Sequence, residues 1–141
     1  MGVCYVPPAG SKQERTRCIE RRLEALATEV AAAGAAGTVI LGGDFNAKVG
    51  DLGSPMQPDI DLLVRGTTCM AVDDHGQRLV AFCERTALVL CTGRALGDTK
   101  ALLTWGRKQR SASRMDHVLI SRRAFACVYE CIVPQKKFLS L

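Results

Sequence analysis

Two polar side chains in the segment VILGGDFNAKVG, residues Val39 to Gly50, have the chemistry of a reaction site. Asp44 can accept or relay a proton, and Asn46 can donate two amide hydrogens to an anionic oxygen. The apolar run before them ends in two glycines, which predicts a buried strand followed by a tight turn. Both side chains would then lie on a loop at the carboxyl end of a strand, with Phe45 between them pointing into the core. The alternative is that Asp44 and Asn46 are ordinary turn residues.

Asp116 interrupts a second apolar segment, RMDHVLIS, which predicts a strand over residues Arg114 to Ser121. A carboxylate in such a strand needs a partner, because an unpaired buried charge is costly. That partner is either an arginine, in a structural role, or a histidine that Asp116 orients for catalysis. Tyr5 lies near the end of a weakly alternating strand predicted over Gly2 to Val6. By itself, Tyr5 is better explained as an amphipathic sheet residue than as a site residue.

A cluster of basic side chains precedes the Asp116 strand: Arg107, Lys108, Arg110 and Arg114. A loop this basic can bind phosphates and would make that binding weaken with salt. A solvated hairpin loop is the alternative. The chain carries a net charge of +5, from 19 basic and 14 acidic residues, which suits an anionic partner without proving one.

The elements that must position these residues alternate between strand and helix. Ser11 and Glu14 form a capping box that predicts the start of a long helix, and Gly34 and Gly37 end it. Its apolar stripe consists of Ile19, Leu23, Leu26 and Val30. A strand over Thr38 to Leu41 follows and delivers Asp44. The order strand, helix, strand predicts an α/β fold.

The second half of the sequence begins with an irregular segment over Asp51 to Asp74, and its pattern then predicts shorter helices and strands. A helix is expected over Gln77 to Thr86, with His75 just before it as a capping or surface residue. The remaining predictions are strands over Leu88 to Cys91, Ala101 to Trp105 and Val128 to Val133, and a helical turn over Arg122 to Ala126.

Composition excludes several classes of protein. The hydrophobic content of 48% and charged content of 23% are ordinary for a globular chain, and 141 residues suffice for one domain or part of a larger one. Its apolar runs are too short and too rich in glycine to span a bilayer, and no signal peptide is evident. The seven cysteines are odd in number and form no CxxC pair, so we expect reduced thiols, no zinc, and an intracellular protein, nuclear or cytoplasmic.

Taken in order, these segments resemble the endonuclease/exonuclease/phosphatase superfamily, the DNase I-like fold. The matching motifs are YVPP (Tyr5 to Pro8), the long helix, GDFN (Gly43 to Asn46), Thr104-Trp105 and RMDHVLIS. The form GGDFNAKVG and the spacing of Gly76, Leu79, Phe82 and Cys83 look most like LINE-type retrotransposon endonucleases and their craniofacial-development-protein relatives. The resemblance covers residues 2 to 141. It implies part of a four-layered αββα sandwich, with mixed sheets and outer helices.

The resemblance also implies a role for each site residue. Tyr5 matches the tyrosine that hydrogen-bonds the scissile phosphate, and Asn46 the asparagine that holds the phosphate oxygens. Asp44 matches the aspartate that positions the attacking water or protonates the leaving oxygen. Asp116 matches the aspartate that orients the catalytic histidine. The implied activity is hydrolysis of phosphodiesters with Mg²⁺ or Mn²⁺, with DNA as the expected partner and no membrane involved.

Two departures from the family limit that expectation. The upstream asparagine and glutamate that bind the metal, and the closing Ser-Asp-His motif, have no counterpart in this sequence. His117 follows Asp116 directly, but its strand context makes it a sheet residue in our interpretation. We therefore expect residues 1 to 141 to be a partial, inactive domain that self-associates through apolar surface. The alternatives are a non-catalytic nucleic-acid-binding remnant and a phosphatase of the same superfamily.

Overall fold

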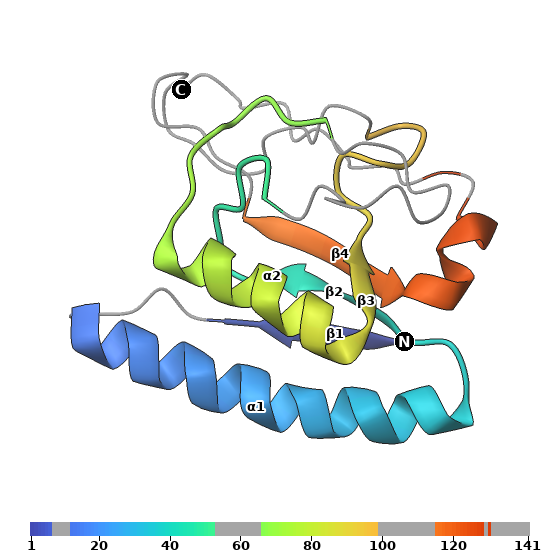
Figure 1. Ribbon diagram of the computed structural model, residues 1–141, viewed down its shortest axis with the longest axis horizontal. Helices are drawn as coiled ribbons and strands as arrows, with labels where there is room; N and C mark the ends of the chain where they lie inside the picture. Colours follow the sequence, from blue (N-terminus) through green and yellow to red (C-terminus); the bar gives the residue numbers. More distant parts are fainter. Residues whose placement is uncertain (7–11, 53–65, 99–114, 129, 131–141) are drawn as a thin grey trace, which may run out of the picture.

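A four-stranded mixed sheet forms the centre of the molecule (Figure 1). The computed structural model describes residues 1–6, 12–52, 66–98, 115–128 and 130, with side chains from residue 19 onward in the first helix. The strands, in their order across the sheet, are β1 (Gly2–Tyr5), β2 (Ile40–Asp44), β4 (Asp116–Ser121) and β3 (Leu88–Leu90). β1 and β2 are parallel, whereas β4 runs antiparallel to both β2 and β3. The predicted α/β class is confirmed, and so are these four strands to within a few residues.

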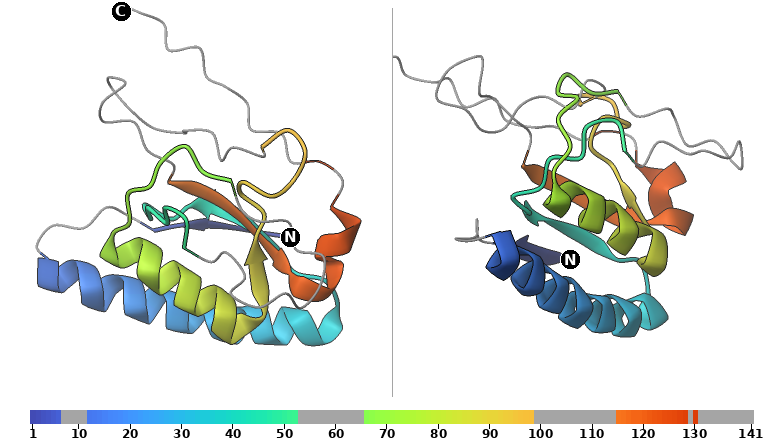
Figure 2. Two further views of the ribbon diagram at one scale, coloured as in Figure 1. Left: turned by 45° about the horizontal axis from the view of Figure 1, so that its top comes forward. Right: turned by 60° about the vertical axis from the view of Figure 1, so that its left-hand side comes forward.

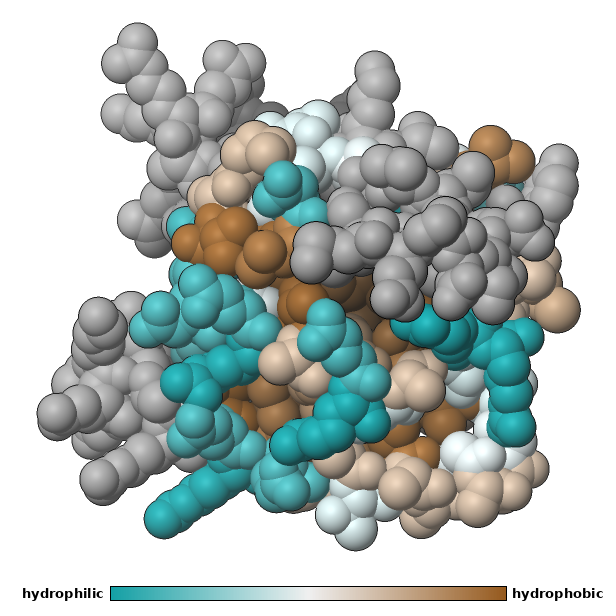
Figure 3. Space-filling view, viewed as in Figure 1, coloured by the Kyte–Doolittle hydropathy of each residue, from teal (hydrophilic) through white to brown (hydrophobic). Residues whose placement is uncertain are grey.

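Two helices, α1 (Lys12–Ala36) and α2 (Asp74–Thr86), run side by side along one face of the sheet, which we call the helix face (Figures 1 and 2). The predicted stripe of α1 is buried there at Ile19, Leu23 and Val30. Hydrophilic side chains cover much of the outward surface of the two helices, whereas the last part of α1 is less hydrophilic (Figure 3). Ion pairs Arg78–Glu20 and Arg85–Glu24 join α2 to α1 on that surface.

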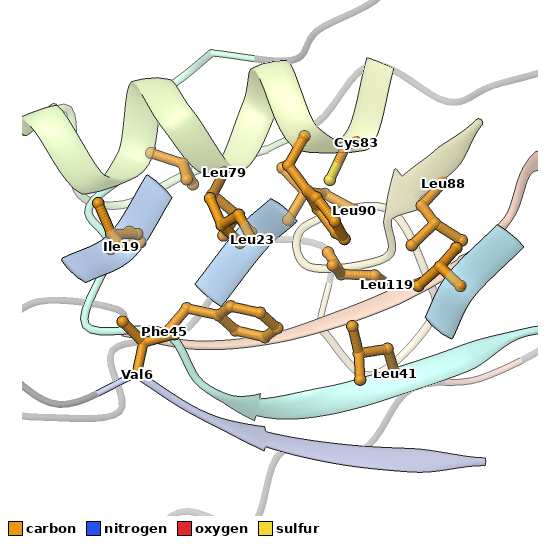
Figure 4. Packing of buried hydrophobic residues seen from close by; sticks show 14 of the residues in the cluster. Val6, Ile19, Leu23, Leu41, Phe45, Leu79, Cys83, Leu88, Leu90 and Leu119 are labelled. Carbon is orange, nitrogen blue, oxygen red and sulfur yellow. The ribbon is translucent and has the colours of Figure 1, made fainter. Parts of the chain in front are cut away.

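The main core fills the space between the helices and the sheet (Figure 4). Phe45 is 1% exposed and packs here, as predicted, because it follows the last residue of β2 and points to the helix face. Leu41 and Leu119 reach the same core from β2 and β4. Leu79 and Phe82 come from α2. The alternation of side chains along each strand therefore places every second residue in this core.

The opposite side of the sheet, which we call the outer face, has a smaller apolar cluster. Val89, Cys91 and Ile120 project there and are covered by Phe125 of the 3₁₀ helix η2 (Arg122–Cys127). Arg123 of η2 also donates hydrogen bonds to the carbonyls of Gly34 and Gly37, at 3.1 and 2.6 Å. Carbonyl groups at the end of α1, which lack partners inside the helix, are satisfied in this way.

Helix α2 begins earlier than the sequence indicated, and its cap is Asp73 rather than His75. The Asp73 carboxylate accepts from the Gly76 N–H at 2.8 Å. His75 is only 7% exposed, and neither of its ring nitrogens has a hydrogen-bond partner among the described residues. The predicted capping or surface role of His75 is therefore wrong, because Asp73 reaches the free N–H groups first and α2 turns His75 inward.

Several expectations fall outside the described residues. These are the Ser11–Glu14 capping box, the Ala101 to Trp105 strand, the basic loop, and most of the Val128 to Val133 strand. Within the described part of the chain, no helix is long and apolar enough to cross a membrane. The described cysteines are free thiols, with Cys83 and Cys91 buried and Cys127 exposed.

Candidate functional site

Tyr5, Asp44 and Asp116 lie directly beside one another across three strands. Tyr5 is the register partner of Asp44 between β1 and β2, and Asp44 is the partner of Asp116 between β2 and β4. Residues opposite each other in a sheet point to the same face, so all three project from the outer face. We call this line the Tyr5–Asp44–Asp116 row. It lies where β1 and β2 end and β4 begins.

Asp44 is the last residue of β2, not part of a loop as its glycines indicated. Gly43 serves close packing instead: a Cβ on Gly43 would lie 1.8 Å from the Cys4 carbonyl oxygen of β1. Gly43 has a φ of 156°, and the absence of a side chain lets the strands approach. The ladder continues past Asp44, because the Val6 N–H donates to the Asp44 carbonyl at 2.8 Å.

Asp116 also differs from expectation, because its side chain is exposed rather than buried. The apolar residues of β4 begin only after it, and Asp116 stands at the end of the strand where solvent reaches the outer face. The expected burial of Asp116 is therefore wrong, whereas its pairing with an arginine or a histidine stays a prediction. Tyr5 is likewise 59% exposed, so the row is open to a ligand from solvent.

Asn46 connects the ends of β1 and β2. Its backbone N–H donates to Asp44 Oδ1 at 2.9 Å, and its side-chain Nδ2 donates to the Val6 carbonyl at 2.7 Å. Its φ is 46°, in the left-handed region that asparagine tolerates better than most residues. The bond between the Asn46 N–H and Asp44 Oδ1 thus closes a local turn directly after β2. That turn leaves one hydrogen of Asn46 Nδ2 beyond the bond to Val6.

The electrostatics of the row raise the pKa of the Asp44 carboxyl. Partial burial raises the pKa of the Asp44 carboxyl, and the nearby charge of Asp116 raises it further. The hydrogen bond from the Asn46 N–H acts in the opposite direction, since it stabilises the ionised form. The net pKa lies above the ordinary value of 3.8. Two neighbouring carboxyl groups in different surroundings are a common arrangement for acid and base chemistry.

His117 faces away from the row. It is 1% exposed on the helix face, and its Nε2 lies 2.9 Å from the Ala47 carbonyl oxygen. Adjacent residues of a strand point to opposite faces, so His117 cannot be the histidine that Asp116 would orient. This placement agrees with our interpretation of His117 as a sheet residue.

Sequence reasoning missed Asp73, which holds the segment after Asn46 in place. Besides capping α2, its carboxylate accepts from the Lys48 N–H at 3.0 Å, and the Asp73 N–H donates to the Lys48 carbonyl at 3.1 Å. Gly76 permits this contact, because a Cβ there would lie 1.8 Å from the same carbonyl oxygen. An aspartate immediately before an apolar helical pattern was the available signal.

The row has part of the chemistry of a metal site. Carboxylate oxygens such as those of Asp44 and Asp116 suit a hard divalent cation. Within the described ranges, however, no three side chains of His, Cys, Asp or Glu are grouped so that they could hold an ion. These residues therefore do not fit a complete metal centre.

A cavity of about 560 Å³ opens on the outer face, and the members of the row are not among its lining residues. Ile40, Val118 and Ile120 form its floor, Cys127 and Val128 form part of its wall, and Glu130 is its charged residue. Ile40 and Val3 of the same face are 37% and 87% exposed. Apolar surface therefore adjoins the polar row on this side of the sheet.

Comparison with protein families gives one match that spans nearly the whole chain. The model of the Endonuclease/Exonuclease/phosphatase family matches residues 2–136, which include every member of the row. Comparison with curated proteins gives no match.

Proposed function

Because the chain belongs to the endonuclease/exonuclease/phosphatase family, we propose that its row receives a phosphodiester of DNA, as in a retroelement-type endonuclease. Family membership indicates hydrolysis of phosphodiesters or phosphate esters in general, and the family generally depends on a divalent metal. The narrower proposal is supported by the GGDFNAKVG segment and by the Gly76, Leu79, Phe82 and Cys83 spacing. The observation that carries it is the in-register placement of Tyr5, Asp44 and Asp116.

Each member of the site has a distinct task in this proposal. The exposed Tyr5 hydroxyl and the remaining hydrogen of Asn46 Nδ2 donate to the phosphate oxygens, where charge accumulates in the transition state. Asp44, whose pKa is raised, protonates the leaving oxygen or positions the attacking water. A positioned acid or base of this kind typically contributes about 10²–10⁴ in rate.

Neither of the two histidines of the chain is placed where Asp116 could orient it. His75 lies in α2 on the helix face and His117 points into the main core, both away from the row. We therefore propose that the 141 residues by themselves bind DNA without turning it over. Without a fitting metal centre, no step is assigned to a metal here.

The outer face has the properties of a surface that packs against a second layer. Val3 and Ile40 are exposed, and the cavity beside them is mostly apolar. Burying apolar surface of this kind is favourable. We propose that a second sheet covers it, giving the αββα sandwich of the family. We also propose that, without such a layer, two chains associate through this face.

Two assays on the purified chain test the function. Nicking of supercoiled DNA and release of phosphate from a phosphomonoester are measured with Mg²⁺ and with Mn²⁺, alongside DNA binding at several salt concentrations. Binding that weakens with salt, without nicking, agrees with the proposal; the basic loop (Arg107, Lys108, Arg110, Arg114) is the expected contact. Phosphate release from the monoester would support a phosphatase instead.

A longer product of the gene, if it nicks DNA, separates the enzyme from a binding remnant. Asp44→Ala should abolish nicking and leave DNA binding nearly unchanged, because the carboxyl acts on the reacting groups. Asp116→Asn should cost less. Glu84→Gln, an exposed change on α2, is the matched control. The 141 residues alone are not expected to nick DNA. If they do, and if His117→Ala abolishes that nicking, then the assignment of Asp116 as the orienting aspartate and of His117 as a sheet residue is refuted.

A further inference from the structure

We infer that His117 is a positioning residue for the site: from the helix face, it fixes the backbone that holds Asn46 against Asp44. This inference deepens the proposed function and rests on it, because Asn46 matters to the reaction only if the row binds a phosphate ester. The geometry that carries it lies beneath the row, on the opposite side of the sheet.

The hydrogen bonds of His117 define its tautomer. A carbonyl oxygen only accepts, so at 2.9 Å from Ala47 O the Nε2 atom of His117 must carry the hydrogen. Nδ1 lies 3.4 Å from Thr92 Oγ1, whose side chain is fully buried, and can accept from that hydroxyl. Ala47 is also fully buried, so no water replaces this bond if it is lost.

The Ala47 carbonyl is a sensitive point because it belongs to the Ala47–Lys48 peptide, which begins one residue after Asn46. Asn46 has the unusual φ of 46°, which the surrounding contacts must maintain. The bond from Asn46 Nδ2 to Val6 O lies on one side, and the bond from the Lys48 N–H to Asp73 Oδ1 lies on the other. His117 joins Ala47, between them, to β4, the strand that carries Asp116.

A core-filling role predicts a different outcome. The His117 ring lies 6.3 Å from the Phe45 ring, between centroids, so an aromatic residue at position 117 could preserve that packing. If His117 only filled space, His117→Phe would leave the Asn46 turn unchanged. If His117 positions the turn, the loss of the donor should loosen Asn46 specifically, even where the core stays packed.

The test compares His117→Phe with His117→Gln by NMR on the labelled chain. Glutamine carries an amide donor that can reach Ala47 O, whereas phenylalanine carries none. In His117→Phe we expect hydrogen exchange of the Asn46 amide to rise about fivefold to tenfold, as for the loss of one hydrogen bond. The Asp44 carboxyl should then titrate at higher pH, because the Asn46 N–H no longer stabilises its ionised form. His117→Gln should restore both.

Three results overturn the inference: unchanged Asn46 exchange in His117→Phe, a uniform rise across all strands, or a His117→Gln variant that behaves like His117→Phe. If His117→Phe does not fold, Thr92→Val gives a milder test, since it removes only the hydroxyl beside Nδ1. Thr92→Val should raise the hydrogen-exchange rate of the Asn46 amide more than the rates of the β1 amides. An equal rise in both would count against the inference. None of these measurements uses a substrate, so failure of the DNA assays leaves their outcome intact.

Discussion

Asp44 and Asp116 occupy directly opposed positions on antiparallel strands, so two carboxyl groups share one end of the outer face. The charge of Asp116 adds to partial burial in raising the pKa of Asp44. A sheet normally disfavours like charges in opposed positions. Retaining them at the end of two strands is a local cost to stability, and such costs concentrate at functional sites.

Asp44→Asn should stabilise the protein near neutral pH. The pKa of Asp44 is higher in the folded than in the unfolded protein. The stability that its protonated carboxyl contributes is therefore fully present below the unfolded-state pKa and is lost as the pH rises through the folded-state pKa. Asparagine keeps an oxygen for the Asn46 N–H without the charge. Thermal melts should therefore show a higher Tm than wild type at neutral pH, with the difference disappearing below pH 3.8. Glu84→Gln controls for removal of a surface charge, and a gap that widens in acid would contradict the argument.

Glycine-to-alanine substitutions should change the free energy of unfolding in opposite directions at different positions. At Gly43 and Gly76 a Cβ would lie 1.8 Å from a backbone carbonyl oxygen, so strand β1 or the Lys48 segment must move. Both substitutions should lower the free energy of unfolding by at least the usual cost of overpacking, which is about 1–3 kcal/mol. Gly34→Ala, in α1 with nothing within 4 Å, should raise it by about 0.5–1 kcal/mol. Denaturant titrations measure all three, and equal effects would count against the packing described.

The thiols should differ in reactivity according to burial. Burial raises the pKa of Cys83 to about 12, so almost no reactive thiolate is present at neutral pH. Cys127 is exposed. Brief alkylation of the native protein, followed by peptide mass spectrometry, should label Cys127 and spare Cys83, and denaturant should abolish the difference. Rapid native labelling of Cys83 would mean that α2 separates readily from the sheet.

The outer face should bind a hydrophobic dye or a second copy of the chain. Ile40 lines the apolar cavity and Val3, on the same face, is 87% exposed. Exposed apolar patches promote association. Dye fluorescence and sedimentation should both respond to Val3→Lys, which adds a charge to this surface. Val3 lies on an exposed face, so the variant should still fold. A wild-type chain that is monomeric, binds no dye and melts cooperatively would argue against the proposal.

Local patterns predicted the helices and strands well because burial follows periodicity. Ile19, Leu23 and Val30 repeat at helical spacing and all reach the main core. Phe45 was expected to point away from Asp44 and does. The convergence of Tyr5, Asp44 and Asp116 depended on the family resemblance, since nothing in their local sequence specifies strand register.

Other features could not be predicted because they depend on contacts distant in sequence. Asp44 ends a strand because β1 and β4 both extend to it, whereas its glycines alone indicate a turn. His75 is buried because Asp73 caps α2 and bonds the Lys48 segment at the same time. The role of His117 depends on a partner 70 positions away.

The most direct test of the row is NMR titration of the labelled chain with a single-stranded DNA oligonucleotide. As the phosphodiester binds, we expect the amide signals of Tyr5, Asn46 and Asp116 to shift together, while those of α2 stay fixed. Tyr5→Phe should weaken this binding about fivefold, as for one hydrogen bond. Shifts confined to α1 and α2, with the row unchanged at saturation, would contradict the central claim.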